Sequence, residues 1–117
     1  MDLVIIERWG IETMDTRELF ARLIQCEAGG EGDNGMRAVA SVVMNRVRTR
    51  TGEYGRYNTI RDVIYQQGQF NCARTVLGGE PNYQNVYNMN PSQEHYDIAQ
   101  WAIDGGRLAN LWQALWF

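Results

Sequence analysis

Glu27 is the residue of this sequence whose type and position best suit acid–base chemistry. It follows Leu19 by eight residues and Leu23 by four, so it falls within the apolar stripe of a predicted helix. Partial burial and the negative end of the helix dipole both disfavour the charged carboxylate, so we expect a raised pKa. A carboxylic acid that stays protonated near neutral pH can protonate a leaving-group oxygen, as the acid of a glycosidase does.

Two structural roles are also open for Glu27. Its carboxylate could cap a neighbouring backbone group or pair with an arginine such as Arg46. A second carboxylate about 5–10 Å away would be needed for hydrolysis by two acids. Glu31 is the nearest candidate, but it follows two glycines in a loop, and the pattern does not give its direction. Glu31 could therefore bind Arg46 or a substrate, or be a solvated loop charge.

The thiols and the single histidine suit other chemistry less well. Cys26 or Cys72 with His95 could form a thiol–imidazole pair. However, Cys26 lies near a helix C-terminus, which opposes thiolate formation, and His95 is predicted to be a surface residue. The cysteines could instead form at most one disulfide, which would flank Glu27. Three such residues are too few for a four-ligand zinc site within one chain, so we expect no metal and no cofactor.

The elements that would position these residues are mostly helices. Asp15, with Glu18 three residues later, predicts the start of the first helix, and Gly29 and Gly30 predict its end. A second helix is predicted over residues 35–49.

Shorter elements are predicted in the second half of the chain. Thr59 opens a short helix, residues 69–76 are extended or form a small hairpin, and residues 78–90 are a loop. Asn90 is the predicted N-cap of a further helix that reaches about residue 104, with Pro91 and Gln93 supporting it. Helical spacing returns over residues 108–116. The prediction is a mostly α domain, α+β at most, with four to five helices over residues 1–117.

Composition limits the partners that the chain can have. The 117 residues carry a net charge of −3, with eleven arginines, no lysine and no basic run, so we expect no nucleic-acid partner. The longest aliphatic run, Leu3 to Ile6, is far shorter than a membrane span or the apolar region of a signal peptide. We therefore expect neither a membrane partner nor a signal peptide in this chain.

Residues 19–47, LFARLIQCEAGGEGDNGMRAVASVVMNRV, resemble the signature of bacterial cell-wall hydrolases that degrade spore-cortex peptidoglycan during germination. The shared features are a Glu-Ala-x-Gly-Glu motif at 27–31, Gly35, and Asn-Arg-Val at 45–47. A second block, Thr59 to Phe70, resembles the family segment T-I-R-x-V-I-Y-Q-P-x-x-F. It has Gln67 where proline is usual. A weaker third match covers 111–117.

The resemblance implies a lysozyme-like fold and cleavage of the β-1,4 bond between N-acetylmuramic acid and N-acetylglucosamine. The first glutamate of its motif is the implied catalytic acid, and that position is Glu27. Acting alone, Glu27 would suit a lytic transglycosylase, which closes a 1,6-anhydro ring and needs no second carboxylate. We expect five further residues to contact the substrate, with turn, core or exposed-loop roles as the alternatives: Glu31, Gln69, Phe70, Tyr83 and Tyr87.

The short segment before the first helix resembles that of the spore-coat members of the family. The resemblance therefore implies peptidoglycan glycan strands and a spore-coat protein as partners, in the spore coat, cortex or cell wall. Family members usually continue beyond the Trp-Phe segment, whereas this sequence ends at Phe117. A second interpretation therefore stays open, namely a non-catalytic module with the same fold that binds peptidoglycan or the coat.

Overall fold

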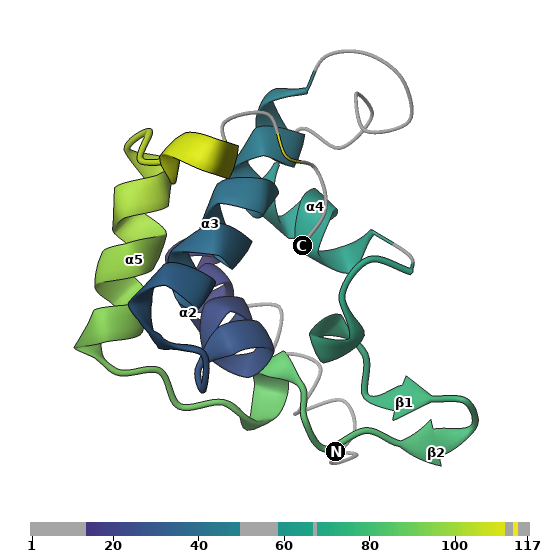
Figure 1. Cartoon of the computed structure of the whole chain (residues 1–117). Helices are drawn as coiled ribbons and strands as arrows, with labels where there is room; N and C mark the ends of the chain where they lie inside the picture. The colour runs from purple at the N-terminus through teal and green to yellow at the C-terminus, as the bar shows by residue number, and fades with distance from the viewer. Residues whose placement is uncertain (1–13, 50–58, 67, 112–113, 115–117) are drawn as a thin grey trace.

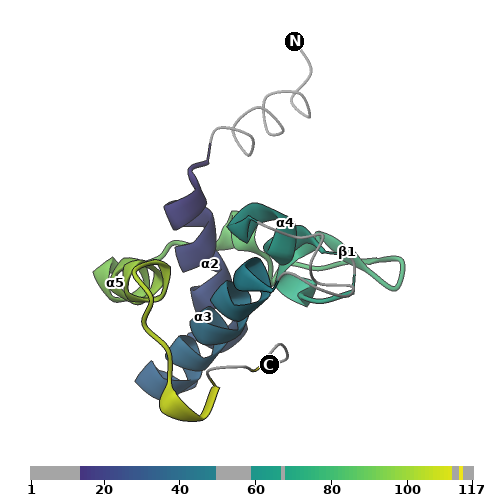
Figure 2. The same ribbon diagram turned by 90° about the horizontal axis from the view of Figure 1, so that it is seen from above.

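The computed structural model describes residues 14–49, 59–66, 68–111 and 114. Four α-helices lie in these ranges: α2 (Thr16–Ala28), α3 (Gly32–Arg48), α4 (Ile60–Tyr65) and α5 (Gln93–Ile103). Helices α2 and α3 lie at the centre, with α5 on one side of the pair and α4 and a small hairpin on the other (Figures 1 and 2). The predicted mostly helical fold with a small hairpin is confirmed. None of the described helices is long and apolar enough to cross a membrane.

Helix α2 begins where the capping pattern predicts. The Asp15 carboxylate accepts a hydrogen bond of 2.7 Å from the backbone N–H of Glu18, which satisfies one of the free donors at the helix start. Glu18 does not complete a capping box, because its carboxylate pairs with Arg22 one turn later at 3.0 Å. The apolar face that α2 buries in the core consists of Leu19, Phe20, Leu23 and Ile24.

Helix α3 begins at Gly32, three residues before its predicted start. The polar residues ahead of 35 have the composition of a loop, yet they form the first turn of the helix. Asp33 lies in that turn, where a negative charge complements the helix dipole, and it pairs with Arg37 at 2.7 Å. The Asp33–Arg37 pair stabilises the first turn of α3, which the spacing of apolar residues could not predict.

The hairpin lies later in the chain than its predicted position at 69–76. Strand β1 (Val76–Leu77) pairs antiparallel with β2 (Glu80–Pro81). Gly78 and Gly79 between them have φ values of +58° and +83°, which suit a tight two-residue turn. Part of the predicted hairpin is instead a 3-10 helix, η2 (Asn71–Ala73).

Helix α5 has a different cap from the predicted Asn90. Ser92 is its N-cap, and the Ser92 backbone N–H donates to Nδ1 of His95 at 2.9 Å in a capping box. His95 is therefore a buried capping residue rather than the predicted surface histidine. The predicted cap at Asn90 is therefore wrong by two residues, because the capping box of Ser92 and His95 starts the helix later.

A polar cluster joins α3 to the chain beyond α5. The Asn45 side chain donates to the carbonyls of Leu111 and Ala114 and accepts a 2.8 Å hydrogen bond from Nε of Arg107. Residues 109–111 form a 3-10 helix, η4 (Ala109–Leu111). Of the predicted helical continuation over 112–116, only Ala114 is described, and it is not helical; the other residues lie outside the described ranges.

Candidate active site

Glu27 lies in the last turn of α2 and is half-buried, between buried Cys26 and Ala28. Burial raises the pKa of its carboxyl above the ordinary value, and the negative charge of Glu31 raises it further. The direction is the predicted one. The effect of Glu31 was not part of the prediction, because the path of the chain after two glycines could not be derived from helix periodicity.

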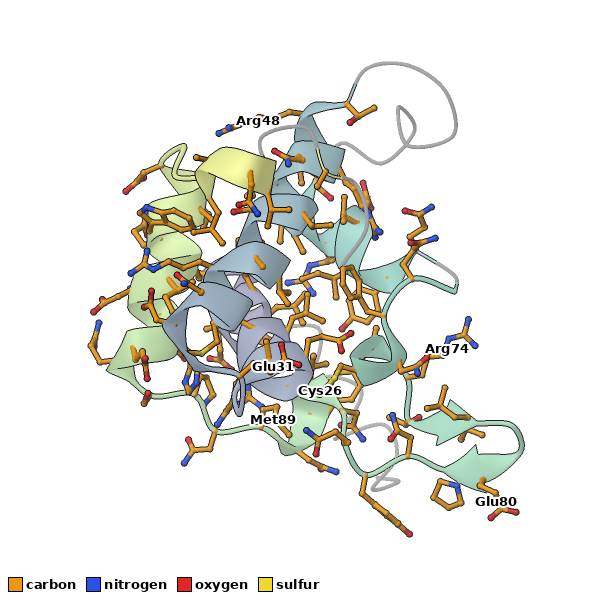
Figure 3. All side chains as sticks on the ribbon, viewed as in Figure 1. Cys26, Glu31, Arg48, Arg74, Glu80 and Met89 are labelled. Atoms are coloured by element: carbon orange, nitrogen blue, oxygen red, sulfur yellow. A yellow bond between two sulfur atoms is a disulfide. The ribbon has the colours of Figure 1, made fainter. Side chains whose placement is uncertain are left out.

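The turn between α2 and α3 brings these two carboxylates to one end of the helix pair. Gly29 caps α2, and Glu31 is the exposed residue that precedes α3. Figure 3 shows Glu31 and Cys26 at this end, whereas Arg48 lies at the opposite end of α3. A Cβ on Gly35 would lie 2.6 Å from the Glu31 Cβ, so a glycine at 35 lets Glu31 fold closely over the start of α3.

Neither a backbone cap nor Arg46, the two structural partners considered for Glu27, is among the causes of its shifted pKa. Arg46 is buried, and its guanidinium lies 5.2 Å from the centre of the Phe70 ring. The Glu27 carboxyl is thus partly desolvated without a positive charge among the causes of its shifted pKa.

Cys26 and Cys72 form a disulfide with a Cα–Cα distance of 6.1 Å. It links the last turn of α2 to η2, and Cys26 directly precedes Glu27 in the chain. Both sulfurs are bonded, so neither cysteine is the nucleophile of the thiol–imidazole pair considered above. The sequence left this pairing open, because 46 residues separate the two cysteines.

The two residues that precede η2 differ in exposure. Gln69 is partly exposed, but Phe70 is only 5% exposed and belongs to the core beneath Arg46. This burial leaves little of the Phe70 ring free to stack on a sugar, so the core role is the one the structure supports. Periodicity over so short a segment could not separate the two roles.

Tyr83 and Tyr87 lie in the segment between the hairpin and α5 but have different surroundings. Tyr83 is 77% exposed, and its carbonyl accepts a 2.9 Å hydrogen bond from the Asn88 side chain. Tyr87 is partly buried, and its hydroxyl lies 2.8 Å from the hydroxyl of Tyr65 at the end of α4. Tyr83 therefore presents a free aromatic face on a fixed backbone, whereas Tyr87 shares its polar end with another phenol.

Arg22 fixes this segment to α2. Its Nη1 donates to the carbonyls of Val86 and Met89 at 3.0 and 2.9 Å. These carbonyls belong to η3 (Val86–Asn88) and the residue after it. Arg22 falls within the motif that resembles the cell-wall hydrolases. The sequence pattern did not predict its hydrogen bonds to backbone carbonyls more than 60 residues away.

Side-chain amides are the class of residue that sequence reasoning missed near Glu27. Gln84 donates to the carbonyl of Cys26 at 3.2 Å, and Asn82 donates to carbonyls on both sides of Cys72. Asparagine and glutamine in an exposed loop carry no distinguishing pattern, since their partners are backbone atoms. Among the described residues, no group of three or more His, Cys, Asp or Glu could hold a metal ion.

The chain is similar to bacterial proteins named as cell wall hydrolases. Residues 30–117 match the family described as Cell Wall Hydrolase, a region that includes Glu31 and begins just after Glu27. Over 100 residues, the chain is 29% identical to the cell wall hydrolase CwlJ of Halalkalibacterium halodurans, covering 86% of this chain and 64% of that protein. It is 30% identical to CwlJ of Oceanobacillus iheyensis over 100 residues, with coverages of 86% and 65%.

A shorter match is closer in sequence. The chain is 43% identical over 56 residues to CwlJ of Bacillus subtilis, covering 48% of this chain and 39% of that protein. The chain thus spans less than two-thirds of the length of each of these relatives. No solved structure matches it significantly.

Proposed function

Since this chain belongs to the cell wall hydrolase family, we propose that it cleaves the glycan strands of peptidoglycan, with Glu27 as the catalytic acid. The bond is the β-1,4 linkage between N-acetylmuramic acid and N-acetylglucosamine. The observation that carries this proposal is the half-buried Glu27 carboxyl at the end of α2, whose pKa is raised by burial and by Glu31. A raised pKa keeps the carboxyl protonated at a pH where an exposed glutamate is ionised.

Glu27 can perform both proton transfers of a lytic transglycosylase. Its carboxyl protonates the glycosidic oxygen while the bond from that oxygen to the anomeric carbon of the muramyl sugar breaks. The resulting carboxylate then accepts the proton of the sugar's 6-hydroxyl as that oxygen bonds to the anomeric carbon. The product is a 1,6-anhydro ring, and the acid is regenerated without a second carboxylate.

Glu31 is the second carboxylate that hydrolysis, the alternative to transglycosylation, would use. Two-carboxylate glycosidases place their acids about 5–10 Å apart, and Glu31 is near enough to influence the Glu27 charge. Because Glu31 is exposed beside the helix start, it can also bind an amide or hydroxyl of the glycan. Mass spectrometry of the products separates the routes: anhydromuramic ends indicate transglycosylation, and reducing muramic ends indicate hydrolysis.

The remaining substrate contacts follow from exposure. Tyr83 offers an aromatic face to a sugar ring, and Tyr87 and Gln69 offer polar groups to its N-acetyl and hydroxyl groups. Phe70 supports this surface from the core and does not stack on the glycan itself.

We further propose that the substrate is spore-type peptidoglycan and that the protein acts in the cell wall, cortex or coat, with a coat protein as a partner. The names of the relatives and the matched family support a role in the cell wall. A disulfide next to the proposed catalytic residue is typical of proteins in an oxidising environment.

The test is the Glu27→Gln variant in a turbidity assay on purified spore-cortex peptidoglycan. We expect it to lose cleavage by a factor of about 100 or more, with an unchanged circular dichroism spectrum. The matched control is Glu80→Gln, an exposed carboxylate at the far end of the hairpin in Figure 3, which should cleave like the wild type. Retained cleavage in Glu27→Gln would contradict the assignment. Wild-type binding to the sacculi without loss of turbidity would instead favour the non-catalytic module.

A further inference from the structure

Cys26, the residue before Glu27, is held from two directions. Its sulfur is bonded to Cys72 in η2, and its carbonyl accepts a 3.2 Å hydrogen bond from Nε2 of Gln84. The carbonyls in the last turn of a helix have no partner within the helix. The Gln84 amide therefore supplies a bond that the backbone of α2 cannot make for itself at this position.

Asn82 connects these two attachments. Its Nδ2 donates to the carbonyls of Asn71 and Arg74, at 3.1 and 2.8 Å, which lie on either side of Cys72. The same amide lies 3.1 Å from the carbonyl of Gln84, and Oδ1 of Asn82 accepts from the Gln84 N–H at 3.3 Å. Its two hydrogens are thus shared among three carbonyls.

These contacts form a closed ring, which we call the α2 clamp. It runs from Cys26 through the disulfide to Cys72, through the neighbouring carbonyls to Asn82, on to Gln84, and back to the Cys26 carbonyl. The clamp attaches to the last turn of α2 at Cys26, the residue directly before Glu27. The two glycines that follow this turn restrict the backbone little, so the clamp supplies the order that the local sequence does not.

We propose that the α2 clamp positions the Glu27 carboxyl for proton transfer, with Asn82, Gln84 and the Cys26–Cys72 disulfide as positioning groups. This inference rests on the proposed function of Glu27. Removal of one link frees the last turn of α2, so that the carboxyl moves relative to the scissile oxygen and becomes more exposed to water. A displacement of about 1 Å at a catalytic group lowers turnover by as much as about 100-fold, whereas glycan contacts elsewhere are unchanged.

Gln84→Ala and the double variant Cys26→Ala/Cys72→Ala test the clamp. We expect kcat to fall by about tenfold or more in each, with KM changed by less than about twofold. The pH at which activity is lost on the alkaline side should also move lower, because a more solvated Glu27 ionises more easily. Titration of the 13C-labelled carboxyl by NMR should show the same downward change in the pKa of Glu27, independently of any activity.

Two variants control for simple loss of stability. Ile98→Val removes a methylene from the core on α5, and Gln93→Ala removes the exposed bond from its side-chain amide to Asp97. Each should lower the Tm or leave it unchanged without moving the pH profile or the Glu27 titration. Rescue by Gln84→Asn is not expected, since the shorter side chain cannot reach the Cys26 carbonyl.

The outcomes separate the clamp from the proposed function. If Glu27→Gln is inactive but the clamp variants keep the wild-type kcat, pH profile and NMR titration, the clamp is structural only and the inference is wrong. If Glu27→Gln cleaves peptidoglycan normally, the proposed function fails whatever the clamp variants do. A downward change in the Glu27 titration of both clamp variants, absent in the controls, supports the positioning role.

Discussion

The Glu31 carboxylate lies close enough to Glu27, across the Gly29–Gly30 turn, for its charge to raise the pKa of Glu27. Glu31→Gln removes that charge and leaves the burial of Glu27 in place. We expect the alkaline limb of the pH–activity profile to move to lower pH, because the acid then loses its proton more readily. Initial turbidity rates over a pH series measure this limb. Glu80→Gln should leave the limb where it is, and an unmoved limb in Glu31→Gln would contradict the coupling.

Glu27→Gln should also change how stability depends on pH. The pKa of Glu27 is higher in the folded chain than its ordinary value of 4.5. Its contribution to stability is therefore present below 4.5 and is lost as the pH rises through the raised folded value. We expect the glutamine variant to be more stable than the wild type at neutral pH and equal to it in acid. Urea unfolding at several pH values tests this, and equal curves at neutral pH would rule it out.

Asn45→Ala should be among the most destabilising single changes at a polar residue. It removes two donated hydrogen bonds and leaves Nε of buried Arg107 without its acceptor. We expect a loss of about 3 kcal/mol in the free energy of unfolding, most of it from the unpaired charged group. Gln100→Ala, which breaks an exposed bond to Asp104, should cost less than about 0.5 kcal/mol. Denaturant titrations of the pair give the comparison.

Gly106→Ala should distort the packing around Trp101. A Cβ at position 106 would collide with the indole ring, which itself lies against the guanidinium of Arg37. We expect a loss of about 2 kcal/mol, together with a changed near-ultraviolet dichroism signal from tryptophan. Gly30→Ala is the matched control, because a Cβ there meets open space and should change stability by less than about 0.5 kcal/mol. Equal stability of the two variants would contradict the contact.

Features set by local chemistry could be predicted from the sequence. Asp15 and Thr59 cap their helices because the acceptor and its N–H lie three residues apart. The burial of Glu27 followed from its spacing to Leu19 and Leu23, which is fixed once the segment is helical. The same reasoning failed at α5, where Asn90 was predicted as the cap but the capping box is formed by Ser92 and His95.

Contacts between distant segments could not be predicted. The disulfide, the Gln84–Cys26 bond and the Asn45–Leu111 bond join residues 46 to 66 positions apart. With only two cysteines, the sequence left a single possible disulfide but did not decide whether it forms. The partners of Gln84 and Asn45 could not be predicted, because a side-chain amide binds any carbonyl that the fold brings near. The prediction therefore named the proposed acid and the possible disulfide beside it, but missed the amides of Asn82 and Gln84.

The hydrogen bonds from Arg22 to the η3 segment affect how this part of the chain unfolds locally. This segment has no ladder of backbone bonds like a sheet, yet its carbonyls are held by a side chain that emerges from the middle of α2. Local unfolding of the η3 segment breaks the Arg22 hydrogen bonds and therefore requires α2 to unfold locally as well. The η3 segment and α2 thus form one cooperative unit. Deuterium should accordingly enter the amides of residues 86–89 at rates close to those of the helix, and far slower than at the hairpin tip.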